Sequence, residues 1–298
     1  MSPAPDQSPV TPRDLPAWRS LLYVPASAEK FIARAHERGA DAIILDLEDG
    51  VAPEAKAPAR AGLAAAVAAV RRGGADVLVR INRPLRLAVQ DIAAAVAAGA
   101  DGLVCTKVMG ADHLRLLSEL TAESEAEAGR PVGGLRFVAL IEEARALAHA
   151  EAIAAADPRV VALGVGGEDL ATDLGAEPTP DALDLPKRLG VIAARAAGVL
   201  PLGFIGTVAG LGDLEGYRAM LRRSRAIGFA CASCVHPSQV PIINEEYGPR
   251  PEEVARAKRL VAAFEAALAE GRGAVAFEGQ MVDRPIVERA RRLIARAG

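Results

Sequence analysis

The sequence predicts an α/β fold, a (β/α)8 TIM barrel with a C-terminal helical extension. Eight short runs of β-branched and other apolar residues recur along the chain, and Ala-rich segments with helical periodicity lie between them. Strict alternation of strand and helix implies parallel strands joined by right-handed crossovers. Over residues 19–236 each unit takes about 27 residues, which suits a barrel domain of roughly 250 residues. A doubly wound open sheet is the alternative.

The expected elements follow one another in a regular order. The strands are expected to begin near Ser20, Ala42, Asp76, Gly102, Leu135, Val160, Pro201 and Phe229. The helices between them are expected over residues 28–38, 58–71, 87–98, 111–128, 144–155, 184–197 and 214–226. Residues 1–17 are read as a flexible N-terminal tail, residues 18–248 as the barrel domain, and residues 249–298 as a C-terminal helical extension or lid.

Composition excludes several classes of function. The chain has 298 residues and a net charge of -3, and it contains no long basic run, which argues against nucleic acid or an anionic membrane as a partner. Charged residues interrupt every apolar stretch before the ~20 residues of a membrane span, and the first residues lack a signal-peptide core. Three cysteines do not suggest a disulfide framework. We therefore expect a cytoplasmic enzyme that acts on small molecules.

Polar residues close most of the predicted strands. In barrels of this kind the active site lies at the carboxyl ends of the strands. The residues at these positions are Asp46, Glu48, Asp49, Arg80, Asn82, Lys107, Glu142, Glu143, Glu168, Asp169 and His236.

Two of these carboxylates predict a metal site. Glu142 and Asp169 follow consecutive strands, so they are expected to converge on one hard divalent cation such as Mg²⁺, which takes one or two protein carboxylates together with waters and substrate oxygens. Zinc is disfavoured because the four histidines are scattered without ligand spacing. The alternative for Glu142 and Glu168 is that they are acids placed at helix N-termini, where the helix dipole favours them.

The basic residues allow more than one interpretation. Arg80 is positioned to clamp a substrate carboxylate with its fork of donors, or else to form a structural ion pair with Asp46 or Glu48. Lys107 is a candidate Schiff-base lysine, but that chemistry leaves the acidic cluster unexplained.

Two motifs are read as structural. The segment from Cys231 to Cys234 has redox-motif spacing but lies within a strand, and the run from Gly164 to Gly167 lacks the complete nucleotide-binding fingerprint. We interpret the cysteines as buried small residues and the glycines as room for backbone near a substrate.

Six motifs occur in a family-specific order: RSLLYVPASAEKFIARA, DAIILDLEDGVAPEAKAPAR, VRIN, ALIEEARAL, GGEDLATDLG and VHPSQVPIIN. Together they resemble the citrate lyase β-subunit group of the HpcH/HpaI aldolase superfamily, from Arg19 to about Asp283. The resemblance implies a (β/α)8 barrel in which Glu142 and Asp169 bind Mg²⁺. It also implies that Glu142 and Arg80 contact the substrate, and that Glu48 acts near the metal-bound waters.

The same resemblance implies a carbon-carbon lyase. Members cleave or form 3-hydroxyacyl-CoA thioesters such as citryl-CoA, malyl-CoA and citramalyl-CoA, releasing acetyl-CoA and a keto acid. In related malyl-CoA lyases an aspartate from a neighbouring subunit is the acid/base, and Asp283 in GQMVDRP matches it, which implies a homotrimer or homohexamer. The alternative role of Asp283 is a helix N-cap, with Pro285 in the first turn.

One departure from the group's pattern affects the expected substrate. The Gly-Lys pair that many members carry before the His-Pro motif is replaced here by Cys231 and Ala232, which puts the thioester preference in doubt. Three alternatives therefore stay open: a malate synthase or malyl-CoA thioesterase activity, a CoA-independent aldolase acting on pyruvate-like enolates, and a citrate lyase subunit that requires a carrier protein.

Overall fold

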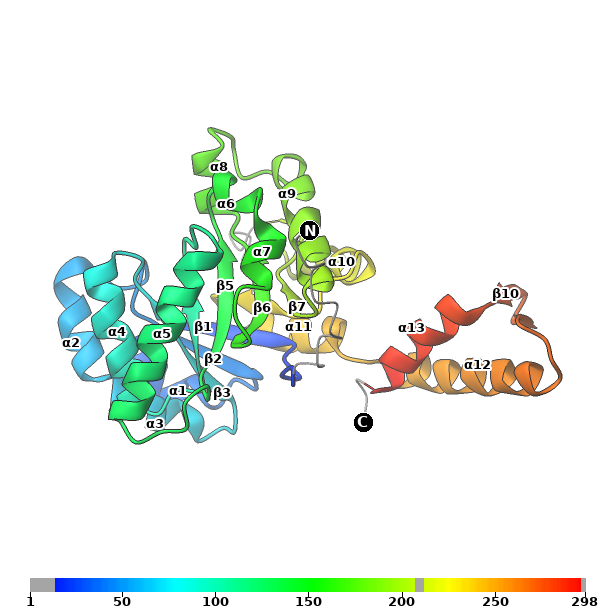
Figure 1. Cartoon of the computed structure of the whole chain (residues 1–298), viewed down its shortest axis with the longest axis horizontal. Helices are drawn as coiled ribbons and strands as arrows, with labels where there is room; N and C mark the ends of the chain where they lie inside the picture. Colours follow the sequence, from blue (N-terminus) through cyan, green and yellow to red (C-terminus); the bar gives the residue numbers. More distant parts are fainter. Residues whose placement is uncertain (1–13, 207–211, 296–298) are drawn as a thin grey trace, which may run out of the picture. The chain divides into compact units, whose positions relative to one another are not determined.

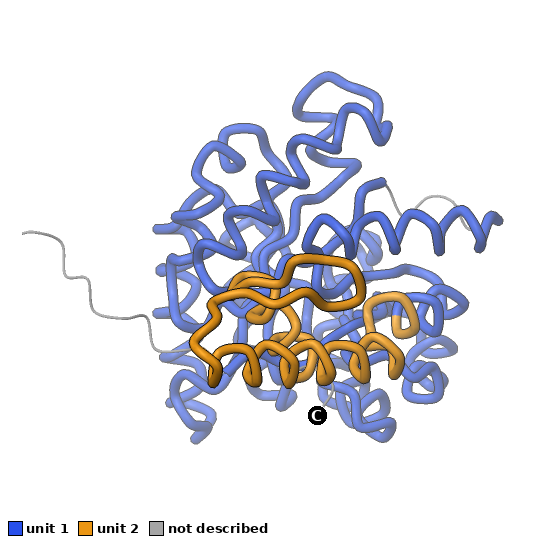
Figure 2. The backbone as a smooth tube through the Cα atoms, turned by 90° about the vertical axis from the view of Figure 1, so that its right-hand side faces the viewer, with its two compact units in different colours: residues 1–243 blue, residues 244–298 orange. Residues whose placement is uncertain are grey.

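The computed structural model describes residues 14–206 and 212–295. The chain forms two compact units, residues 1–243 and residues 244–298, which Figure 2 shows in different colours. Residues 1–13 of the expected N-terminal tail lie outside the described residues.

The first unit is built on eight parallel strands that neighbour one another in sequence order. They are β1 (Ser20–Pro25), β2 (Ala42–Asp46), β3 (Asp76–Ile81), β4 (Gly102–Cys105), β5 (Arg136–Ile141), β6 (Val160–Val165), β7 (Leu200–Leu202) and β8 (Ala232–Cys234). The last strand returns to the first, because β8 pairs in parallel with β1.

The sheet closes between β7 and β8. Leu202 and Cys231 form a parallel bridge, the N–H of Gly203 donates to the carbonyl of Cys231 at 2.8 Å, and the N–H of Ala230 donates to the carbonyl of Pro201 at 2.9 Å. An open doubly wound sheet would leave two unpaired edges, whereas here every strand has a neighbour on both sides. The predicted (β/α)8 barrel is therefore confirmed.

Helices surround the strands of the first unit (Figure 1). They are α1 (Glu29–Ala35), the 3-10 helix η1 (Pro53–Ala55), α2 (Lys56–Ala61), α3 (Leu63–Arg71), α4 (Leu85–Ala97), α5 (Ala111–Glu127), α6 (Ala144–Leu147), α7 (Ala150–Ala154), α8 (Glu168–Asp173), α9 (Pro180–Ala196) and α10 (Leu214–Ala226). Two of the expected helices are each divided in two. Helix α8 was not among the expected ranges, although it begins at Glu168, as the alternative interpretation of that residue required.

Local capping chemistry explains where α9 and α10 begin. The hydroxyl of Thr179 accepts a hydrogen bond from the N–H of Ala182, and Pro180 occupies the first helical position, so α9 begins at residue 180 instead of the expected 184. The carboxylate of Asp213 caps α10 in the same way by accepting from the N–H of Gly216 at 2.8 Å.

Alternate strand residues fill the barrel interior, as the period-two pattern of strands requires. The interior cluster consists of Trp18, Leu21, Ala42, Ile44, Leu78, Val104, Val138, Leu140, Val161, Ala162, Leu202 and Cys231. Trp18 precedes β1, and its indole N–H donates to Asp76, the first residue of β3, at 2.7 Å. This ring therefore closes the amino end of the barrel, and the polar inward-facing residues are left for the carboxyl end.

The second unit has a small core of its own. It contains α12 (Pro251–Ala269), a hairpin of β9 (Val275–Phe277) and β10 (Gln280–Val282), and α13 (Arg284–Ala295), while α11 (Gln239–Tyr247) spans the boundary between the units. The hairpin turn is fixed by Glu278, which pairs with Arg256 at 2.7 Å and Arg259 at 3.0 Å. No helix in the described part of the chain has the length and hydropathy needed to cross a membrane.

Candidate active site

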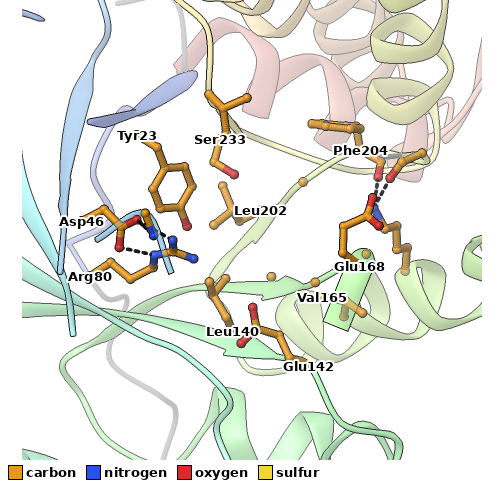
Figure 3. A pocket seen from close by; sticks show the side chains of 18 of the residues that line it. Tyr23, Asp46, Arg80, Leu140, Glu142, Val165, Glu168, Leu202, Phe204 and Ser233 are labelled. Carbon is orange, nitrogen blue, oxygen red and sulfur yellow. Dashed lines mark hydrogen bonds and ion pairs between the residues drawn. The ribbon is translucent and has the colours of Figure 1, made fainter. Parts of the chain in front are cut away.

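A cavity of about 350 Å³ opens at the carboxyl ends of the barrel strands. In Figure 3, Tyr23, Asp46 and Arg80 lie on one side of it, Glu168 and Phe204 lie on the other, and Glu142 lies between them. The cavity therefore brings together side chains from β1, β2, β3, β5 and the loops after β6 and β7, as expected of a barrel active site.

Arg80 is held in place by two carboxylates and an aromatic ring. Its Nε and Nη2 donate to the two oxygens of Asp46, each at 2.6 Å, and its Nη1 lies 3.0 Å from Glu48. The guanidinium carbon lies 4.9 Å from the ring centroid of Tyr23. Burial acts to lower the pKa of Arg80, but the hydrogen bonds and charge of Asp46 outweigh it and raise that pKa. Arg80 is therefore a fixed cation that lines the cavity.

Both interpretations of Arg80 are consistent with this geometry. The ion pairs with Asp46 and Glu48 are present, as the structural alternative required. A guanidinium nevertheless carries five N–H groups, more than these contacts use, and Arg80 lines the cavity. The bidentate pair with Asp46 orients the remaining donors, so a role in binding a substrate carboxylate stays open.

Glu142 is a buried carboxylate whose charged form is destabilised by its surroundings. It is 6% exposed, and its Oε2 accepts a hydrogen bond from the N–H of Lys107 at 2.7 Å. Burial raises the pKa of Glu142 to about 7, and the negative charges of Asp169 and Glu48 act in the same direction. A cation placed against this group would relieve both the loss of hydration and the repulsion between carboxylates.

Asp169 lies in the first turn of α8, beside the same lysine. Its side chain is 47% exposed, and one carboxylate oxygen lies 3.9 Å from the ammonium of Lys107. In the described ranges, no group of three or more His, Cys, Asp and Glu side chains has the arrangement of a metal site. Two carboxylates of this kind nevertheless suit Mg²⁺, which completes its octahedral shell with water and substrate oxygens. The donor set therefore fits the expected metal.

Glu48 lies between the two basic residues of the site. It is 5% exposed, close to Nη1 of Arg80, and it accepts a hydrogen bond from the ammonium of Lys107 at 2.5 Å. Burial raises the pKa of Glu48, whereas Lys107 and Arg80 act to lower it. The resemblance implied that Glu48 acts near the metal-bound waters, and the structure places its charge close enough to Glu142 to act on the pKa of that residue.

Lys187 is a residue of the cavity that the sequence analysis did not single out. This residue of α9 is 6% exposed and lines the cavity, where its ammonium donates to the carbonyls of Phe204 at 2.8 Å and Gly206 at 2.5 Å. Burial lowers the pKa of Lys187 to about 8. The lysine bridges α9 to the backbone after β7 and so holds one wall of the cavity together.

Two glycines of β6 and its loop leave room for the site. A Cβ at Gly166 would lie 2.6 Å from Cγ of Glu142, and a Cβ at Gly164 would lie 2.8 Å from a methyl group of Leu140. Both contacts are closer than real Cβ atoms approach their neighbours. These glycines give space to side chains of the cavity, which agrees with their interpretation as room near a substrate.

His236 and Asp283 are not among the residues that line this cavity. His236 lines a neighbouring cavity, with Nδ1 2.7 Å from the hydroxyl of Ser238. Asp283 is exposed, belongs to the second unit and directly precedes α13. Its role at the site stays a prediction.

The two positions of the missing Gly-Lys pair, Cys231 and Ala232, lie at the start of β8. Ala232 is fully buried in β8 and pairs with Ser20, while the next residue, Ser233, lines the cavity. Because neighbouring strand residues face opposite sides, position 232 faces away from the site. Cys231, at the position of the missing glycine, belongs instead to the interior cluster of the barrel, together with Leu140 and Leu202, which line the cavity.

Comparisons with known proteins agree on one family. The model of the HpcH/HpaI aldolase/citrate lyase family matches residues 19–237. The citrate lyase subunit beta of Leuconostoc mesenteroides subsp. cremoris is 35% identical, and the match covers 93% of this chain and 92% of that protein. A (3S)-malyl-CoA thioesterase of Cereibacter sphaeroides is 34% identical, with 94% of each chain covered.

A solved structure gives the same answer. The protein CitE from Mycobacterium tuberculosis, in complex with magnesium, acetoacetate and coenzyme A, is 34% identical to this chain with a TM-score of 0.72. The match covers 94% of this chain and 97% of that one. The resemblance inferred from the six sequence motifs is thus confirmed, and the chain belongs to the HpcH/HpaI aldolase/citrate lyase family.

Proposed function

We propose that this protein is a Mg²⁺-dependent carbon-carbon lyase that cleaves a 3-hydroxyacyl-CoA thioester of the citryl-CoA, malyl-CoA or citramalyl-CoA type. The observation that carries the proposal is a pair of carboxylates beside Lys107, those of Glu142 and Asp169. Glu142 is buried, has its pKa raised to about 7 and lines a cavity that also contains a fixed arginine. Two relatives support the same assignment: the citrate lyase subunit beta, and the CitE protein whose structure contains magnesium and coenzyme A.

Each residue has a distinct part in the proposed reaction. Glu142 and Asp169 hold the cation, which when bound supplies a Lewis acid for the oxygen of the hydroxy acid. Arg80, oriented by Asp46, binds the substrate carboxylate. Glu48 accepts hydrogen bonds near that oxygen, and the walls around Tyr23 and Phe204 exclude water.

A second cavity, of about 800 Å³, favours a CoA thioester over a simple keto acid. Tyr23, Pro25 and Val235 line both cavities, so the second cavity adjoins the first. An acyl group in the first cavity can therefore extend a long arm into the second one.

The side chains of the second cavity suit the phosphates and adenine of CoA. Lys30, Arg34 and Arg38 line it at intervals of four residues, and the ring of Phe31 beside them is 59% exposed. Three cations suit the negative phosphates, and an exposed aromatic ring suits a stacked adenine.

Asp283 completes the proposal as the group that protonates the enolate of the departing acetyl thioester. We propose that it reaches the site from a neighbouring subunit of a homotrimer or homohexamer, with the second unit acting as a lid. Light scattering coupled to gel filtration measures the mass of the assembly, and a monomer that is active at every concentration would contradict the shared site.

Hydrolysis of the thioester is the second candidate function, favoured by the relative named as a malyl-CoA thioesterase. The experiment supplies acetyl-CoA with glyoxylate, pyruvate or oxaloacetate in the presence of Mg²⁺, and follows the 3-hydroxyacyl-CoA product and free CoA by mass spectrometry. A lyase forms the condensed thioester without free CoA, whereas condensation followed by hydrolysis releases CoA and the hydroxy acid together. Formation of neither product from these substrates, and no hydrolysis of malyl-CoA supplied directly, would contradict both functions.

A further inference from the structure

Lys107 has an uncommon backbone conformation for a residue with a side chain. It follows β4 and has a φ of 48°, in the left-handed region that favours glycine and, to a lesser extent, asparagine. This conformation directs its N–H toward Glu142, which accepts the hydrogen bond at 2.7 Å. The backbone of Lys107 thus orients the buried carboxylate of the proposed metal site.

The side chain of the same residue contacts the remaining acids. Its ammonium donates to Glu48 at 2.5 Å and to Asp49 at 3.1 Å, and it lies 3.9 Å from Asp169. Lys107 is therefore an ammonium surrounded by carboxylates, and its N–H donors are already engaged, which does not suit a Schiff-base nucleophile.

We infer that Lys107 is a positioning residue with two separate actions: its left-handed backbone holds Glu142 in place, and its ammonium holds Glu48 while competing electrostatically with the bound cation. The inference rests on the proposed function, because it requires that Glu142 and Asp169 bind a divalent cation. It goes further by assigning to this lysine the control of how tightly that cation is held.

The sign of each action follows from the contacts. An ammonium 3.9 Å from Asp169 repels a divalent cation at the same carboxylate, so removing its charge should tighten cation binding by roughly tenfold. The same removal leaves Glu48 with Arg80 as its remaining basic partner, so Glu48 is less firmly oriented and turnover should fall although binding improves. Losing the backbone hydrogen bond to Glu142 should instead weaken binding.

Four variants separate these effects. Lys107→Gly and Lys107→Asn remove the charge and accept the left-handed backbone, Lys107→Ala removes the charge but disfavours that backbone, and Lys107→Arg keeps the charge as the matched control. Isothermal titration with MgCl₂ gives the Kd of each protein without any need for activity. Thermal unfolding identifies a variant that fails to fold, in which case the other neutral variant carries the test.

We expect the Kd for Mg²⁺ to be about tenfold lower in the Gly and Asn variants than in the unaltered protein, and unchanged in the Arg variant. The Ala variant should bind Mg²⁺ more weakly than the Gly variant. Turnover should fall in both neutral variants. An unchanged or higher Kd in the Gly and Asn variants would overturn the inference, and equal Kd values for Ala and Gly would overturn its backbone part. If the unaltered protein binds no Mg²⁺, the proposed metal site falls together with the inference.

Discussion

Gly166→Ala tests the link between the glycines of β6 and the proposed metal site. The added Cβ would lie 2.6 Å from Cγ and 3.1 Å from Oε1 of Glu142, so the carboxylate must move by about 1 Å to restore ordinary van der Waals contact. Such a movement stretches the 2.7 Å hydrogen bond from the N–H of Lys107 beyond its useful range.

The size of the effect follows from these distances. Overpacking of this kind costs roughly 1–3 kcal/mol in the free energy of unfolding. Loss of a group that orients a metal ligand typically costs about 10–100-fold in metal affinity. We therefore expect the Kd for Mg²⁺ to rise at least tenfold, whereas the fold is retained.

The matched control is Gly164→Ala, two residues earlier on the same face of the barrel. Its Cβ would meet a methyl group of Leu140 at 2.8 Å, so it imposes a similar packing cost without displacing Glu142. Isothermal titration with MgCl₂ and urea unfolding measure the two effects separately. Equal loss of Mg²⁺ affinity in both variants, or none in Gly166→Ala, would refute the reasoning.

Three further predictions concern other parts of the molecule. Asp283→Asn should lower turnover by about 10²–10⁴-fold and leave the Kd for Mg²⁺ nearly unchanged, and equal loss of both would contradict its role as acid. The double variant Lys30→Ala and Arg38→Ala should have a higher KM for acetyl-CoA but not for acetyl-pantetheine, which lacks the nucleotide phosphates. An equal rise in both KM values would exclude the second cavity as the phosphate site. Burial lowers the pKa of Lys187 from 10.5 to about 8, so between these pH values the unfolded chain binds more protons and stability rises with pH. The free energy of unfolding of the unaltered protein, minus that of Lys187→Met, should therefore rise by up to about 3 kcal/mol between pH 8 and pH 10.5. A difference that stays constant over this pH range would contradict the lowered pKa.

The barrel was predictable from the sequence because its signal is repeated eight times. Each strand is a short apolar run, and each crossover is long enough for a helix, so errors of a few residues at individual ends do not change the topology. The missed helix α8 shows the limit of this reasoning. Its first residues follow the glycine-rich segment from Gly164 to Gly167, and no side chain caps it. The acids Glu168 and Asp169 in its first turn favour a helix start, but the same acids also suit a metal site.

The prediction of the site was partial for a related reason. Sequence position identifies residues at the carboxyl ends of strands, such as Arg80 and Glu142, because the barrel places all those ends together. It says little about a side chain that reaches the site from a helix, and Lys187 within α9 reads as an ordinary solvated lysine. The left-handed conformation of Lys107 is equally hidden, since lysine has no local preference for it.

Cleavage of defined thioesters tests the central claim most directly. Citryl-CoA, malyl-CoA and citramalyl-CoA are incubated with the full chain, with and without Mg²⁺, and with a Glu142→Gln and Asp169→Asn double variant as control. Mass spectrometry then identifies the products. The account predicts that at least one thioester gives acetyl-CoA and its keto acid only when Mg²⁺ and both carboxylates are present. Absence of cleavage of all three, or cleavage that persists in the double variant, would contradict it.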